Sequence, residues 1–228
     1  MITIQQLKKS YGQQPILYLP QWTVQQGEQV ALLGPSGCGK STLLHLLGGV
    51  LAADAGSITI NGQTLSTMSE AARDEFRSKH IGYVFQDFYL IPSLTAKENI
   101  EWALTSQERG SAMKRKQLIE QWFERVGLSD HMNRYPSQLS RGQQQRVAMI
   151  RALIHTPPLV LADEPTGSLD WETASHIMQL LLELSKEHSM TLVTVTHDLH
   201  LAELYPTTVQ MKEINELIKQ PAQKGVLV

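Results

Sequence analysis

The clearest chemical pattern is Gly34-Pro35-Ser36-Gly37-Cys38-Gly39-Lys40-Ser41, which has the spacing GxxxxGKS. It follows the apolar run 30–33 and precedes a helix-like run, 42–47. Glycines at these positions let successive backbone N–H groups point at phosphate oxygens, and the helix start adds partial positive charge. Lys40 supplies a charge for the β- and γ-phosphates, and the Ser41 hydroxyl is placed to bind Mg²⁺. The sequence therefore predicts a nucleoside triphosphate site formed by Gly34, Ser36, Gly37, Cys38, Gly39, Lys40, Ser41 and Thr42.

A second pattern, of the Walker B type, is the apolar strand 159–162 that ends in Asp163-Glu164. In P-loop enzymes an aspartate at the end of a neighbouring strand holds Mg²⁺, and a glutamate beside it can act as a general base on water. Alone, two carboxylates at a strand end are weak evidence for a site. Together with the phosphate-binding loop 34–41, the P-loop, they predict Asp163 as a metal ligand and Glu164 as the catalytic base.

A third pattern is a helix start at Ser140. Ser140 and Gln143 have capping-box spacing, and Val147, Ile150 and Ile154 would form the inner face of the helix. The free N–H groups at such a start can bind an anion. Taken alone, this pattern indicates an ordinary helix start more often than an anion site.

The arrangement of strands and helices indicates an α/β fold. Strand-like runs and a hairpin signal at Asn61-Gly62 dominate the first third, and a helical pattern covers most of 88–152. Strand, helix and strand then follow, a βαβ crossover that requires a partly parallel sheet. We predict one domain, 1–228, with an N-terminal antiparallel β part. Its nucleotide-binding core is formed by 1–86 and 153–228, and the core is interrupted by a helical lobe, 87–152. The strand-like runs are 2–7, 16–19, 22–24, 30–33, 57–60, 159–162 and 191–195.

Composition narrows the function classes. The formal net charge is −2 and the pI near 6.4, which argues against a nucleic-acid partner; the basic run 114–116 fits a solvated helix face. No apolar run is long enough to cross a bilayer, and no signal peptide pattern opens the chain, so we expect a cytoplasmic protein. One cysteine excludes an internal disulfide, and we expect no structural metal site.

Six motifs occur in an order that resembles an ABC-type ATPase, the nucleotide-binding subunit of a membrane transporter. They are the P-loop, Gln86 in Val84-Phe85-Gln86, the signature LSRGQ at 139–143, Asp163-Glu164, Ser168-Leu169-Asp170, and His197 in Thr196-His197-Asp198. The resemblance implies the ABC ATPase fold, ATP and Mg²⁺ as cofactors, and hydrolysis of ATP to ADP and phosphate. It also implies membrane-spanning transporter subunits as partners, at the cytoplasmic face of the inner membrane.

The same resemblance implies roles for single residues. Tyr11 would stack on adenine, Gln86 would contact Mg²⁺ and water while sensing the membrane subunit, and His197 would contact the γ-phosphate. Each residue also has a purely structural alternative: Tyr11 could be an aromatic residue at a turn, Gln86 a polar strand end, and His197 a histidine at a helix start.

The resemblance further implies a head-to-tail homodimer with two ATP molecules at the interface. Ser140, Gly142 and Gln143 would complete the partner's site, and Asp170 would cross the interface.

Arg141 departs from the family's usual LSGGQ. If the backbone there needs positive φ, an arginine strains it; if not, its guanidinium could stabilise charge as an arginine finger does. The sequence leaves both open.

Three stretches, 81–92, 94–99 and 163–170, are most similar to the branch that contains LolD, MacB and FtsE. This implies an export or lipoprotein-release type of transporter; the alternative is an FtsE-like signalling subunit with no transported substrate. The loop 87–92 places aromatic and aliphatic residues after Gln86. They would either receive a short helix of the membrane partner or pack inside the lobe.

Overall fold

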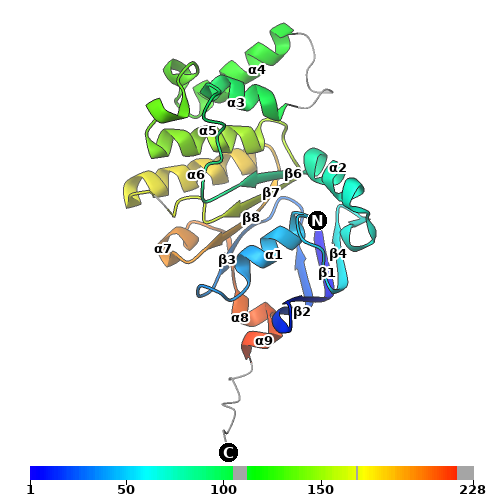
Figure 1. Ribbon diagram of the computed structural model, residues 1–228. Coiled ribbons are helices and arrows are strands. Elements are labelled where there is room, and N and C mark those ends of the chain that lie inside the picture. Colours follow the sequence, from blue (N-terminus) through cyan, green and yellow to red (C-terminus); the bar gives the residue numbers. More distant parts are fainter. Residues whose placement is uncertain (105–111, 168, 220–228) are drawn as a thin grey trace, which may run out of the picture.

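The computed structural model describes residues 1–104, 112–167 and 169–219. The molecule contains two sheets, and helices cover both faces of the larger one (Figure 1). The helices are α1 (Lys40–Leu47), α2 (Glu70–His80), α3 (Ala96–Ala103), α4 (Ala112–Arg125), α5 (Arg141–Leu153), α6 (Trp171–Glu187), α7 (Leu199–Ala202), α8 (Met211–Ile214) and α9 (Glu216–Lys219). Among the described residues, none of these helices is both long and apolar enough to cross a membrane.

The smaller sheet is antiparallel and lies at the N-terminal part of the chain. Its spatial order is β2 (Gln14–Val24), β1 (Ile2–Tyr11), β4 (Ala55–Ile60) and β5 (Gln63–Thr64). Asn61 and Gly62 join the last two strands with φ of 49° and 77°, as a two-residue hairpin turn requires. The hairpin predicted from Asn61-Gly62 is therefore present.

The sequence suggested two separate strands where the structure has the single strand β2. Pro20 lies between them and cannot donate to a ladder, which is why the sequence pattern breaks there. β2 is an edge strand, and its register with β1 passes from Gln5–Gln21 to Leu7–Leu19, skipping Gln6 at φ 50°. An edge position opposite an irregular residue tolerates the proline.

The larger sheet is parallel throughout, which agrees with the partly parallel sheet predicted from the βαβ crossover. Its spatial order is β6 (Ile81–Val84), β7 (Leu159–Asp163), β8 (Thr191–Thr196), β3 (Gln29–Leu33) and β9 (Thr207–Gln210). The carboxyl ends of parallel strands meet at one edge, where ligands bind in open α/β sheets. The P-loop, Gln86, Glu164 and His197 all follow strands at this edge.

The core is divided by the parallel sheet, because alternate residues of each strand face opposite sides. Val30, Leu161 and Val193 pack with α1 and the antiparallel sheet. Ala31, Val160 and Leu192 pack on the other side, with the cluster that includes residues of α3, α4, α5 and α6. Burial on both faces explains why these strands are apolar without alternation.

Helices α3, α4 and α5 gather at one end of the molecule, at the top of Figure 1. α3 begins with a capping box formed by Thr95 and Glu98. These helices occupy most of the range predicted for the helical lobe; the division of the chain into core and lobe stays a prediction.

Candidate nucleotide site

The P-loop has the backbone that its glycines predict. Gly37 and Gly39 have φ of 79° and 95°, a region that other residues rarely adopt. A Cβ on Gly39 would lie 2.6 Å from Leu17 Cδ2, so a larger residue would be strained in its backbone and would also displace Leu17. α1 begins directly afterwards at Lys40, whose Nζ donates to the carbonyl oxygens of Gly34 at 2.7 Å and Pro35 at 3.1 Å.

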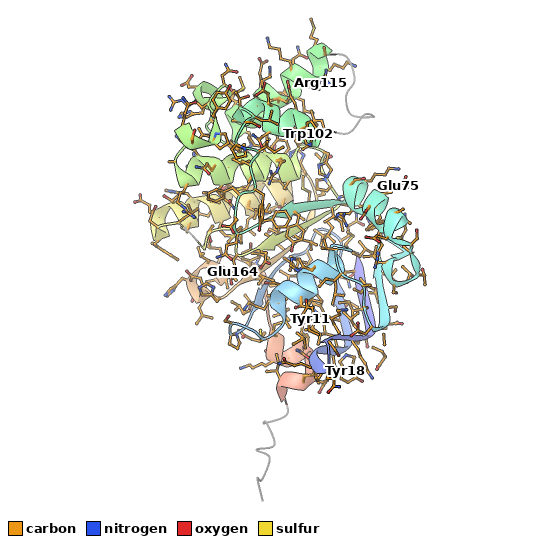
Figure 2. All side chains as sticks on the ribbon, in the orientation of Figure 1. Tyr11, Tyr18, Glu75, Trp102, Arg115 and Glu164 are labelled. Carbon is orange, nitrogen blue, oxygen red and sulfur yellow. The ribbon has the colours of Figure 1, made fainter. Side chains whose placement is uncertain are left out.

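A cavity of about 640 Å³ opens over this loop. Figure 2 labels two of its lining residues, Tyr11 and Glu164, near α1. The structure thus brings together most of the predicted nucleotide-binding residues: the lining consists of Tyr11, Ile16, Ser36, Gly37, Gly39, Lys40, Ser41, Thr42, Gln86, Glu164 and His197. Tyr11 is 52% exposed, so the face of its ring is accessible to a base.

Cys38 belongs to the loop, but its side chain packs elsewhere. It lies against the apolar cluster that contains Met211. Its backbone N–H donates to the carbonyl oxygen of Pro35 at 3.3 Å. Any contact of Cys38 with phosphate would therefore come from the main chain and not from the thiol.

Two of the residues predicted to hold Mg²⁺, Ser41 and Asp163, lie together, and the third, Gln86, lines the same cavity as Ser41. The Ser41 hydroxyl donates to Asp163 Oδ1 at 3.1 Å, joining the start of α1 to the end of β7. A hydroxyl and a carboxylate are oxygen donors of the kind that Mg²⁺ prefers, with phosphate oxygens and water completing its shell. Burial raises the pKa of Asp163, and the hydrogen bond from Ser41 opposes that rise. The donor set fits the ion.

The raised pKa of Asp163 predicts how the thermal stability of the protein depends on this carboxyl and on pH. A carboxyl whose pKa is higher in the folded chain destabilises the fold when ionised, and this penalty vanishes as pH falls below its unfolded value, near 3.8. Without nucleotide or Mg²⁺, Asp163→Asn should raise Tm at pH 7 by about 2–4 °C. The difference should shrink toward pH 4, while Mg²⁺-dependent ATPase falls about 100-fold. A lower Tm for Asp163→Asn than for the parent protein at pH 7 would contradict the conclusion that the ionised Asp163 carboxylate destabilises the fold.

Glu164 and His197 form a hydrogen-bonded pair at the same edge. His197 Nδ1 lies 2.8 Å from Glu164 Oε1, and the glutamate side chain is only 15% exposed. Glu164 has φ of 45°, an uncommon conformation, and its N–H donates to the carbonyl oxygen of Val195. Such strained residues cluster at active sites, where the surrounding structure holds them.

The signature residues surround a different cavity, of about 370 Å³. Its lining includes Ser140, Gly142, Gln143 and Asp170, and it shares no residue with the lining of the nucleotide cavity. Ser140 and Gln143 cap α5 reciprocally, as their spacing predicts, and the inner face of α5 is buried. The structure therefore does not bring the signature residues to the P-loop of their own chain.

Two further features surround the signature cavity. A Cβ on Gly142 would lie 2.8 Å from Thr173 Cγ2, so this glycine permits the close approach of α5 and α6. Asp170 caps α6 by accepting from the N–H of Thr173 at 3.0 Å, and this bond lowers the pKa of Asp170. Ser168, the first residue of the Ser168-Leu169-Asp170 motif, lies outside the described residues.

Arg141 is the first residue of α5 and has a right-handed backbone, since it is absent from the described residues with positive φ. The condition for backbone strain is therefore not met. Its guanidinium carbon lies 5.5 Å from the centroid of the Phe88 ring, a cation–π distance. The signature motif thus contacts the loop that follows Gln86.

Sequence reasoning missed two residues, Ile16 in the lining of the nucleotide cavity and Tyr83 near Asp163. Ile16 lines the cavity beside Tyr11 because the β1–β2 hairpin brings both to the P-loop, and an apolar residue in a strand gives no signal of this. Burial raises the pKa of the Tyr83 hydroxyl, and the nearby Asp163 carboxylate adds to the rise. The buried Tyr83 hydroxyl has no hydrogen-bond partner among the described residues.

Comparison with known proteins decides the family. The ABC transporter family matches residues 19–167. The chain belongs to the ABC transporter ATP-binding family. The chain is 45% identical over 209 residues to the uncharacterised ABC transporter ATP-binding protein YbbA of Escherichia coli K12, covering 89% of this chain and 90% of YbbA. It is 39% identical to the ABC transporter ATP-binding protein YtrE of Bacillus subtilis 168, covering 93% and 95%.

Solved ABC cassettes share its structure. A dimeric post-hydrolysis state of the ATP-binding cassette MJ0796, bound to ADP and phosphate, matches with a TM-score of 0.83 and 37% identity. The match covers 92% of this chain and 94% of MJ0796. A second dimeric MJ0796 structure matches with a TM-score of 0.82. This chain is therefore an ABC ATPase that uses ATP and Mg²⁺, and its parallel core, antiparallel sheet and helices have the ABC ATPase fold.

Proposed function

We propose that this subunit uses ATP hydrolysis to drive conformational change in a membrane-spanning partner, and that the residues of the nucleotide cavity do the chemistry. Lys40 and the N–H groups of residues 36–42 bind the phosphates. Tyr11 stacks on the base, with Ile16 beside it. Ser41, Asp163 and Gln86 hold Mg²⁺, which neutralises charge on the β- and γ-phosphates when bound.

Within this proposal, Glu164 takes a proton from the attacking water at its carboxylate. His197 holds that carboxylate through the 2.8 Å contact and presents its other ring nitrogen to the γ-phosphate. The low exposure of Glu164 supports the role, because it keeps the carboxylate in one position.

The separation of the two cavities supports a head-to-tail dimer. Ser140, Gly142 and Gln143 lie at the N-terminus of α5, a ready site for an anion, yet their own P-loop is elsewhere. A second copy can supply the missing nucleotide, with Asp170 reaching across. Both MJ0796 structures are dimeric, which agrees with this arrangement.

The observation that carries the membrane-coupled function is the exposed loop after Gln86. Tyr89 is 64% exposed and Ile91 is 36% exposed, although both are large and apolar. The loop is nevertheless fixed: Arg151 donates to the carbonyl oxygens of Phe88 and Tyr89, and buried Asn99 bonds both the N–H and the carbonyl oxygen of Ile91. A rigid loop that presents apolar side chains suits a short helix of a membrane protein.

Tyr89→Ala tests this docking surface. We expect basal ATPase of the purified subunit to change less than twofold, because Tyr89 lies outside the nucleotide cavity. Recovery of the subunit with membranes of the cell that encodes it should fall about tenfold without added nucleotide. Sedimentation followed by immunoblotting measures the bound fraction.

Phe88→Ala is a second test of the same loop. It removes more packing than Tyr89→Ala, because Phe88 is half-buried and contacts Arg141. Tyr135→Ala is the matched control, since Tyr135 is also an exposed tyrosine, 46%, and lies outside the loop 87–92. Equal membrane recovery for Tyr89→Ala and the parent protein, or loss of folding in both loop variants, would refute docking at this loop.

We further propose an export or lipoprotein-release type of transporter. Support comes from the likeness of 81–92, 94–99 and 163–170 to the LolD, MacB and FtsE branch. The proposal predicts that the membrane protein encoded beside this gene has a large domain outside the cytoplasm. It also places the subunit at the cytoplasmic face of the membrane, bound through that partner. A neighbouring gene for a multi-span permease without such a domain would contradict the branch assignment.

A further inference from the structure

Three exposed side chains form an apolar patch outside the nucleotide cavity. We name Trp171, Leu199 and His200 the α6–α7 patch. Trp171 opens α6 and is 54% exposed, and Leu199 opens α7 and is 62% exposed. The rings of Trp171 and His200 meet edge to face with centroids 5.7 Å apart. α6 and α7 lie side by side (Figure 1). The ring contact between Trp171 and His200 therefore joins the starts of the two helices into one patch.

The backbone fixes this surface in place. Asp170 caps α6 immediately before Trp171, and Asp198 caps α7 by accepting from the N–H groups of His200 and Leu201. Leu201 and Ala202 anchor α7 in the core, which leaves Leu199 and His200 outward. A fixed aromatic and aliphatic pair binds with little loss of conformational entropy.

The position of the patch identifies its occupant. Trp171 lines a cavity of about 200 Å³ with Glu164, His197 and Leu169. Leu169 also lines the signature cavity, together with Asp170. Trp171 therefore stands between the hydrolytic pair and the signature residues, two surfaces that a second copy covers in the proposed dimer.

We infer that the α6–α7 patch is a contact with the second copy of this chain in the ATP-bound dimer, and that it supplies apolar binding energy that the nucleotides do not. This inference rests on the proposed head-to-tail dimer and extends it. Large aromatic residues at the centre of an interface commonly dominate its affinity. Because the dimer is symmetric, each substitution removes the contact twice.

Dimerisation of a hydrolysis-deficient parent, Glu164→Gln, tests the inference. In that background Trp171→Ala should weaken ATP-dependent dimerisation at least about tenfold in Kd, measured by analytical ultracentrifugation over a range of protein concentrations. Binding of ATP to the monomer should change less than twofold, because the patch residues do not line the nucleotide cavity. Trp102→Ala is the control: Trp102 is 75% exposed on α3, and its loss should leave the dimer unchanged.

The outcomes separate the inference from the proposed function. If Glu164→Gln does not dimerise with ATP at all, the proposed dimer fails. If it dimerises and both Trp171→Ala and Leu199→Ser dimerise equally well, the dimer stands and the patch is wrong. If circular dichroism shows that Trp171→Ala is unfolded, the dimerisation of Leu199→Ser alone decides whether the patch is a dimer contact.

Fluorescence gives an independent readout. Of the four tryptophans, Trp22 and Trp122 are buried, so Trp102→Phe leaves Trp171 as the exposed emitter. With Glu164→Gln, Mg²⁺ and ATP, acrylamide quenching should fall, and only at protein concentrations that support the dimer. Protection that is independent of protein concentration would show an effect of nucleotide alone and would overturn the contact.

Discussion

Glu164→Gln should lower the ATPase rate by about 100- to 10,000-fold while ATP still binds. The amide keeps the shape of the side chain and can remain beside His197, but it cannot accept a proton from water. Single-turnover hydrolysis with purified protein, together with an equilibrium measurement of ATP binding, separates the two effects. In the proposed dimer ATP is held until it is hydrolysed, so the same variant should accumulate as an ATP-bound dimer.

Because Glu164→Gln also removes a negative charge, a control variant must lose the same charge away from the nucleotide cavity. Glu203→Gln removes an exposed glutamate after α7 and should leave the rate within twofold. His197→Ala should also lower the rate, since it frees a carboxylate that is now held at 2.8 Å. A Glu164→Gln variant with near-normal turnover would exclude Glu164 as the base and would move the search to Gln86, another polar side chain of the cavity.

Much of the nucleotide site could be predicted because its chemistry is local in sequence. The P-loop requires glycine where Gly37 and Gly39 adopt positive φ, and the Asn61-Gly62 turn has the same origin. Asp163 could be expected beside Ser41 because parallel strands end at one edge of a sheet, and the 3.1 Å hydrogen bond confirms that proximity. The chemical roles of these residues stay predictions.

What the sequence could not supply are contacts between distant segments. Phe88 meets Arg141, and Ile16 reaches the nucleotide cavity, only because of how the two sheets and α5 are placed. Trp171 looks like an ordinary helix start in sequence, and its exposure beside His200 appears only in the fold. Pro20 gave a false strand break because an edge strand tolerates a residue that donates no hydrogen bond.

Arg141→Gly, which restores the usual family residue, should lower the ATPase rate of the purified subunit tenfold or more. The strained alternative predicts a higher rate, but Arg141 has an ordinary helical backbone, so glycine relieves nothing there. Glycine also weakens the first turn of α5 and removes a cation from the rim of the signature cavity. In the proposed dimer that cation lies near the partner's γ-phosphate and can stabilise charge that develops during transfer.

Arg141→Lys distinguishes the charge from the shape of the side chain. Lysine keeps the positive charge but loses the planar guanidinium, so it should retain more activity than glycine and less than arginine. Phe88→Leu addresses the other contact of Arg141: it removes the π face and keeps apolar bulk. If the Phe88 stack only holds Arg141 away from the nucleotide, Phe88→Leu should leave the rate the same or raise it. If instead the stack positions the guanidinium for catalysis, Phe88→Leu should reproduce part of the loss seen in Arg141→Gly. Equal rates for Arg141→Gly, Arg141→Lys and the parent protein would show that the guanidinium does not take part in hydrolysis.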